Sequence, residues 1–362
     1  AWKIYHKNKL TTYDITEYCL KPLGNLYTLI GDYSNAENSI KQYYFVASQE
    51  KNESQKQAAV LNLSNVYQNT GRIDQAIELL EKTIQKEKLT NAQKGLLYNN
   101  LGSNYFLNTR ATKMKSYAFE NAEKAFLKAV LLLEREPSQH EALTNSYRNL
   151  CKLNLERKNK QMALHYFEKA KHTFEKIPNP NPRKKAQFYF DEANMLFKQR
   201  EITASSLAIE RVFKTLITAY SSAKTVLPNQ SALYAETILL DVLDLQAELF
   251  LAQSQPKKAL ESYALAFHIE ALFQSLLVYE NSKIIIQIRN RNRTERCIAI
   301  YQSLFQKENK KNYLESAFLL AEKTKSIVLK ANLNLKKFQS HEEKLLLEQL
   351  QNHNTIIVKE QQ

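Results

Sequence analysis

One spacing of small and large residues recurs along most of the chain. An alanine is followed four positions later by a large residue, and three positions after that by a second small residue. Residues at this spacing share one face of a helix. The pattern therefore predicts a series of helices, each of which buries a large residue between two small ones. The clearest copies are Ala122, Phe126 and Ala129; Ala163, Phe167 and Ala170; and Ala259, Tyr263 and Ala266, with weaker copies beginning at Ala36, Ala76 and Ala317.

A second helical pattern precedes the copies of this spacing. It reads Leu-Gly-x-x-Tyr at Leu23–Tyr27 and Leu101–Tyr105, and Leu-Ser-x-x-Tyr at Leu63–Tyr67. A small residue in this first helix lets the second helix approach closely. Gly31 and Gly71 then fall between the two helices of their pairs, where glycine permits the turn. We call the first helix of each pair helix A and the second helix B.

These paired helices resemble the tetratricopeptide repeat (TPR), which combines a Leu-Gly-x-x-Tyr element with later alanine and aromatic positions. The resemblance implies an all-α protein, a right-handed α-solenoid of six to seven TPR-like helix pairs over residues 10 to about 330. Its fifth unit, near Phe190, Ala193, Phe197 and Ala208, is degenerate. An insertion around residues 110–119 interrupts the third unit.

Glycine and proline are scarce, with 5 and 7 among 362 residues, against about 7% and 5% in average proteins. Sheet-rich folds and phosphate-binding loops need glycine at their turns, and neither Gly-x-Gly-x-x-Gly nor the P-loop motif occurs in the sequence. Cys19, Cys151 and Cys297 are far apart and fall in apolar helical patterns, which favours core positions over a metal site or disulfides. We therefore expect no cofactor, no metal and no catalytic site in this chain.

The segment Tyr313–Leu333 contains an Ala-Phe-x-Leu-Ala-Glu element followed by basic, small and leucine positions. It resembles the last repeat of arrays that precede a caspase-like CHAT domain, and the resemblance covers residues 230–335. It implies TPR-like repeats over 1–270, terminal repeats or capping helices over 271–335, and a charged helical linker over 336–362 toward a further domain. The His-Gly pair of that peptidase-like domain does not occur here, so the chain would be the recognition part of a larger protein.

Several asparagines fall at helix A positions that face the concave side of a TPR array. An amide donates and accepts at once, so a row of amides can hold the backbone of an extended polypeptide whatever its side chains. Arg148 and Lys152 can pair with an acidic side chain, whereas Asp191 and Glu192 would begin an acidic half of the groove. A solvated helix face without a ligand is the alternative interpretation. The predicted peptide-binding residues are Lys21, Asn25, Asn62, Asn65, Asn99, Asn100, Asn145, Arg148, Asn149, Lys152, Asp241 and Asp244.

The formal net charge of +14 also suits a nucleic-acid partner. However, the lysines are dispersed, and the acidic half of the groove would repel phosphates. The expected partner is therefore a protein or peptide, including the protein's own C-terminal domain. The alternatives are a nucleic-acid-binding repeat, a regulatory repeat region of another signalling protein, an enzyme with a pocket between repeats, and an oligomerisation array. The sequence contains no apolar run long enough for a membrane span, and we expect a cytoplasmic location.

Overall fold

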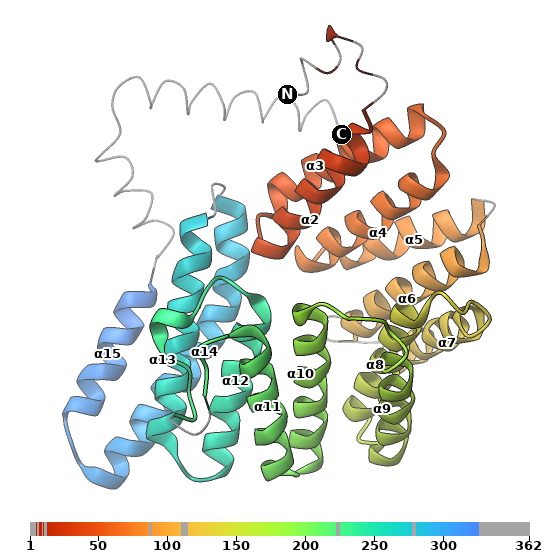
Figure 1. Cartoon of the computed structure of the whole chain (residues 1–362). Coiled ribbons are helices and arrows are strands. Elements are labelled where there is room, and N and C mark those ends of the chain that lie inside the picture. The colour runs from red at the N-terminus through yellow and green to blue at the C-terminus, as the bar shows by residue number, and fades with distance from the viewer. Residues whose placement is uncertain are drawn as a thin grey trace. The chain divides into compact units, whose positions relative to one another are not determined.

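The computed structural model describes residues 5, 7, 8, 10, 13–86, 89–109, 115–221, 225–276 and 280–325. All regular elements within these ranges are helices, and no strand occurs among them. The chain divides into two compact units, unit 1 (Ala1–Ile285) and unit 2 (Ile286–Gln362). Figure 1 shows the helices of unit 1 as successive pairs. The expected all-α fold of paired helices is confirmed.

Unit 1 contains six helix A–helix B pairs among its described residues. Each helix packs against the next one along the chain, and each helix A also contacts the helix A of the following pair. A short π-helix, η1 (Thr16–Leu20), precedes the first pair, and a 3-10 turn, η2 (Gln230–Ala232), precedes the last. The pairs are α2 (Lys21–Ile30) with α3 (Tyr33–Gln49), α4 (Glu53–Asn69) with α5 (Ile73–Lys86), α6 (Asn91–Asn108) with α7 (Lys115–Leu133), α8 (His140–Glu156) with α9 (Lys160–Phe174), α10 (Pro182–Gln199) with α11 (Ile202–Leu216), and α12 (Thr237–Ala252) with α13 (Pro256–Leu276).

The recurring small–large–small spacing forms the core of each pair. Gly24 and Gly102 of helix A face the large residue of their own helix B. A Cβ atom added at these glycines would lie 2.7 Å from Ile40 and 2.6 Å from Phe126, respectively. The close approach of the paired helices therefore requires glycine at both positions. All three side chains of the spacing are buried in the copies that begin at Ala36, Ala76, Ala122, Ala163 and Ala259.

The turn between helix A and helix B has the same geometry and register in five pairs. A residue with left-handed backbone stands five positions before the first small residue, as Gly31 stands before Ala36. The backbone N–H that follows this residue donates to the carbonyl five positions earlier, which closes the end of helix A. The left-handed residues are Gly31 (φ 82°), Gly71 (φ 78°), Lys158 (φ 60°), Arg200 (φ 71°) and Ser254 (φ 58°).

Glycine in place of Lys158 is expected to raise the free energy of unfolding by about 1 kcal/mol. A residue other than glycine costs about 1–2 kcal/mol in the left-handed region, and the more flexible unfolded chain offsets part of the gain. The Lys158 side chain is exposed, so its removal sacrifices little packing. Urea denaturation measures the change. Lys124→Gly, at an exposed position inside α7, is the matched control, and its free energy of unfolding should fall by about 1 kcal/mol. An equal fall in the free energy of unfolding of both variants would contradict the prediction.

The fifth pair follows a register that the sequence pattern did not indicate. Ser205, Ile209 and Val212 of α11 occupy the small–large–small positions, and all three side chains are buried. Ser205 replaces the usual alanine, and its hydroxyl donates to the carbonyl of Ala193 at 2.8 Å. The buried hydroxyl is thereby satisfied, which explains how a polar residue substitutes at a core position.

The expectation of a core position for every cysteine is wrong for Cys19, which is exposed.

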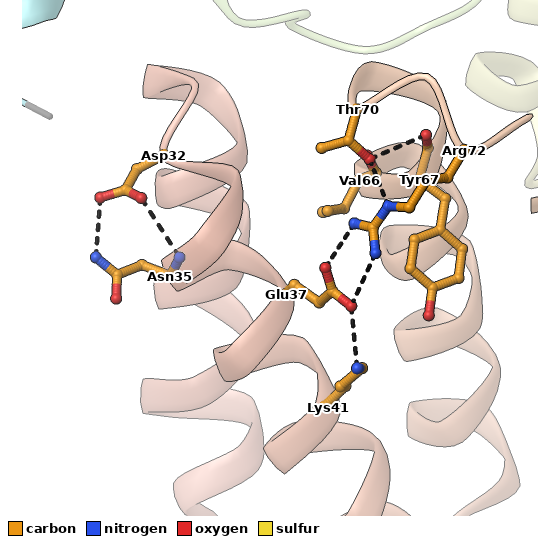
Figure 2. A network of polar contacts seen from close by, with 8 residues as sticks. All are labelled: Asp32, Asn35, Glu37, Lys41, Val66, Tyr67, Thr70 and Arg72. Carbon is orange, nitrogen blue, oxygen red and sulfur yellow. Dashed lines mark hydrogen bonds and ion pairs between the residues drawn. The ribbon is translucent and has the colours of Figure 1, made fainter. Parts of the chain in front are cut away.

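Ion pairs join helix B of one pair to the turn of the next (Figure 2). Arg72, in the turn before α5, donates to both carboxylate oxygens of Glu37 on α3, at 3.2 and 2.5 Å. Lys41 lies 3.0 Å from the same carboxylate. Burial alone would raise the pKa of Glu37, but these two cations hold it below its ordinary value. Glu123 on α7 also follows the first small residue of its spacing, Ala122, and it pairs with Arg157 at 2.6 Å.

In unit 2 the structure describes the greater part of α14 (Glu280–Glu308), which begins before the unit boundary, and α15 (Asn312–Thr324). Cys297 and Leu304 of α14 are buried, whereas Phe318 of α15 is exposed. The division of the chain at residues 270 and 335 stays a prediction, and the proposed linker 336–362 lies outside the described residues. None of the helices in the described ranges has the length and apolar character needed to cross a membrane.

Candidate functional site

Successive A helices of unit 1 lie side by side, and polar side chains join them. Asn149 on α8 donates a hydrogen bond to Asn99 on α6, and Arg148 on α8 pairs with Asp191 on α10. Helix packing in this part of unit 1 is therefore supplemented by polar contacts between residues one repeat apart. We call the side of α6, α8 and α10 that carries these four residues the inner face.

The asparagines of α6 and α8 form a short hydrogen-bonded ladder. The Nδ2 of Asn149 donates to the Oδ1 of Asn99 at 3.0 Å and to the Oγ of Ser103 at 3.3 Å. Ser103 in turn donates to the backbone carbonyl of Asn99 at 3.0 Å. Asn100 instead donates to the carbonyl of Leu96 in its own helix, also at 3.0 Å. The structure therefore brings two of the predicted residues together, adds Ser103, and turns Asn100 toward its own backbone.

A charge cluster centred on Asp191 joins α8 to α10. The Asp191 side chain is 5% exposed, and it pairs with Arg148, which is 13% exposed, and with Lys152 at 3.0 Å. Arg148 also donates to the Oδ1 of Asn145 at 2.6 Å. Burial alone would raise the pKa of Asp191, but the two cations hold it below its ordinary value, so the carboxylate stays charged at neutral pH. The expectation that Asp191 lines an acidic half of the groove is wrong, because Arg148 and Lys152 neutralise it.

The other predicted binding residues lie on helices before α6 and after α10. Asn25 is exposed, and Lys21 pairs with Glu17 at 2.9 Å. The remaining four side chains are partly buried. The role of these six residues as ligand contacts stays a prediction. They are Lys21 and Asn25 on α2, Asn62 and Asn65 on α4, and Asp241 and Asp244 on α12.

Two cavities open where α9 meets α10, and Phe174 and Ile177 line both of them. The first has a volume of about 330 Å³, and its walls also include Pro180, Phe188 and Tyr189. The second has a volume of about 240 Å³ and reaches the inner face. Its walls also include Thr144, Asn145, Arg148, Lys184 and Gln187. The predicted residues Asn145 and Arg148 therefore border a mostly polar cavity to which Phe174 and Ile177 add an apolar wall.

The chemistry that the inner face offers is hydrogen bonding and ion pairing. Burial raises the pKa of the Cys151 thiol to about 12, so at neutral pH this cysteine holds its proton and lacks the thiolate that acts as a nucleophile. Across the described ranges, no three His, Cys, Asp or Glu side chains gather in a way that would hold a metal ion.

No protein-family model matches the chain, and no curated protein matches it by sequence. Among solved structures, the apo form of RapI superposes with a TM-score of 0.51 and 14% identity, covering 76% of this chain and 90% of RapI. Unit 1 has the fold of TPR-like helix pairs. BtubC from P. vanneervenii gives a TM-score of 0.46 at 13% identity, over 70% of this chain and 91% of BtubC. A tetratricopeptide repeat protein from Parabacteroides merdae gives 0.37 at 15%, over 83% of this chain and 97% of that protein.

Sequence reasoning missed three elements of the inner face and of the cavities beside it. It did not pair Arg148 with Asp191, although the two residues are 43 positions apart, about one repeat, and carry opposite charges. A search for complementary charges at the repeat spacing would have found this pair. Ser103 was missed because a serine one turn after an asparagine is unremarkable on a helix. Phe174 and Ile177 were missed because they belong to the end of α9 and the following loop, outside the helix A positions considered.

Proposed function

We propose that unit 1 is a protein-interaction scaffold that binds an extended polypeptide along the inner face of α6, α8 and α10. The observation that carries this proposal is the Asn99–Asn149 ladder beside Arg148 and Asn145. These side chains are partly buried on the faces of rigid helices, and Asn99, Asn149 and Arg148 bond across repeats. A preorganised row of amides of this kind suits the recognition of a peptide backbone.

The bonds within the ladder leave a donor and an acceptor for a ligand. Asn149 uses its Nδ2 and Asn99 its Oδ1 in the bond between them. The Oδ1 of Asn149 can then accept from a backbone N–H of the ligand, and the Nδ2 of Asn99 can donate to a backbone carbonyl. Recognition of this type depends on the extended shape of the polypeptide and tolerates many side chains.

The double variant Asn99→Ala/Asn149→Ala is expected to weaken peptide binding by about thirtyfold, because two hydrogen bonds of about 1 kcal/mol each are lost. The probe is a dodecapeptide selected from a random display library on the wild-type chain, and its affinity is measured by fluorescence anisotropy. The melting temperature should change by only a few degrees. Asn100→Ala is the matched control and should bind as the wild type does, since Asn100 bonds to its own helix. Equal affinity of the double variant would refute this use of the ladder.

We also propose that the chain serves as the recognition region of a larger protein with a CHAT-type domain. The support is the resemblance of Tyr313–Leu333 to the terminal repeat of such proteins, of which the structure describes the part up to residue 325. A ligand on the inner face would then act on the state of that domain. The native coding sequence beyond Gln362 tests this proposal, which requires a His-Gly pair and a later cysteine there.

A further inference from the structure

The junction between the fourth and fifth pairs has little direct packing between α9 and α10. From α2 to α13, α9 and α10 make fewer contacts with each other than any other two consecutive helices. The loop from 175 to 181 connects them, and its residues line both cavities, of about 330 and 240 Å³. Space between the fourth and fifth pairs is therefore available to a ligand.

Aromatic side chains hold the walls of these cavities in place. The rings of Phe174 and Phe188 stack with centroids 4.4 Å apart and planes 7° apart, and Phe188 stacks in turn on Phe167 at 5.4 Å. On the far side, Arg211 lies over the ring of Tyr189 at 4.8 Å and pairs with Glu192 at 2.8 Å. Side chains that are already held in place lose little conformational entropy when a ligand binds. An apolar wall built from them is therefore the kind of surface that accepts a large anchoring side chain.

The rim of the cavity on the inner face carries an exchangeable positive charge. Lys184 lies 2.7 Å from Glu141, and the two side chains are 44% and 50% exposed. An exposed pair of this kind contributes little, so a carboxylate of the ligand can replace Glu141. Arg183, also on the rim, pairs with Glu236 at 3.0 Å. Both cations stand in the first turn of α10, where the positive end of the helix also favours an anion.

We propose that the cavities at the α9–α10 junction bind a bulky apolar side chain of the polypeptide ligand, and that Lys184 selects an acidic residue next to it. This inference rests on the proposed function and deepens it, because it names the class of ligand. The partner is an extended segment with a large aliphatic or aromatic residue beside an aspartate or glutamate. Its backbone would continue along α8 and α6 over the asparagine ladder.

The first test is the sequence preference of the wild-type chain. Random dodecapeptides displayed on phage are selected on the full chain, and the expected result is enrichment of Phe, Trp, Tyr, Leu, Ile or Met close to Asp or Glu. Selection on Lys184→Glu should replace the acidic preference with a basic one and keep the apolar residue. Selected peptides without the apolar residue would overturn the proposal.

The second test measures affinity for one selected peptide. Ile177 lines both cavities, so Ile177→Arg introduces a charged side chain into the wall that they share. This variant is expected to weaken binding by about tenfold or more. Leu131→Arg is the matched control, because Leu131 is 55% exposed on α7 and distant from these cavities in the repeat order. If Ile177→Arg does not fold, as judged by its thermal melt, Glu141→Gln replaces it. That variant releases Lys184 and should strengthen binding by about threefold.

The outcomes separate this inference from the function on which it rests. Peptides that depend on Asn99 and Asn149 but tolerate Ile177→Arg would overturn the anchor cavity and leave the scaffold function standing. If Glu141→Gln binds no more tightly than the wild type, the selection of an acidic residue by Lys184 is overturned in the same way. A library from which no peptide can be selected would overturn both. Apolar–acidic peptides that lose affinity in Ile177→Arg and keep it in Leu131→Arg support the proposal.

Discussion

Replacement of Asp191 by alanine is expected to lower the free energy of unfolding by about 3–5 kcal/mol. Removing one partner of a buried ion pair leaves the other charge without compensation. Here Arg148, whose side chain is 13% exposed, would lose the carboxylate to which it donates. Urea denaturation followed by circular dichroism gives the change. Because α8 and α10 belong to different pairs, the substitution weakens the junction between the fourth and fifth pairs.

The neighbouring residue provides a control for the Asp191 variant. Glu192→Ala removes a carboxylate that pairs with Arg211, whose side chain is 44% exposed, and should cost less than about 1 kcal/mol. The double variant Arg148→Leu/Asp191→Leu removes both charges, and it should be more stable than Asp191→Ala. Similar losses for Asp191→Ala and Glu192→Ala would show that the cluster contributes no more than a surface pair.

The same cluster makes stability depend on pH in the acidic range. Its cations hold the pKa of Asp191 below the ordinary value of 3.8. A depressed carboxyl pKa contributes stability that is present above the ordinary value and is lost as the pH falls through the folded-state value. The difference in free energy of unfolding between wild type and Asp191→Ala should therefore be constant near neutrality and shrink in strong acid. A difference that grows with acidification would have the wrong sign.

Replacement of Phe126 by alanine is expected to lower the free energy of unfolding by about 3–5 kcal/mol. Its ring is fully buried between α6 and α7, and it packs against Gly102, where a Cβ would approach to 2.6 Å. Truncation leaves a cavity that the glycine on the facing helix is too small to fill. Phe45→Ala is the matched control, because Phe45 is 60% exposed on α3 and should cost less than about 0.5 kcal/mol. Equal losses at both positions would contradict the assigned core register.

The repeat register could be read from the sequence where burial restricts the choice of residue. Phe126 and Tyr263 sit between small residues because two helices meet there, and their spacing revealed the pairs. The register of the fifth pair was not predicted, because Ser205 and Val212 meet the same packing requirement with residue types other than alanine. The turns at Lys158 and Arg200 were not predicted, because backbone hydrogen bonds set their shape and accept these residues where glycine would be diagnostic.

For the candidate site, the sequence predicts which face of its own helix each residue occupies, but not the contacts between helices. Asn99 and Asn149 were placed on one face because each position follows from the phase of its own helix. The bond between them, and the pairing of Arg148 with Asp191, depend on how successive pairs stack, which the phase of a single helix does not determine. Ile177 depends on the path of a loop with no periodic pattern.

The sparse contact between α9 and α10 also bears on how the array unfolds. In a linear array, stability is the sum of the repeats and of the coupling between neighbours. Cooperativity is expected to be lowest where that coupling is weakest, so we expect the first four pairs to unfold as one block and the last two as another. The polar bonds of Arg148 and Lys152 to Asp191 carry much of the coupling between these blocks. A ligand seated across the junction would add to that coupling and join two partly independent blocks into one cooperative unit.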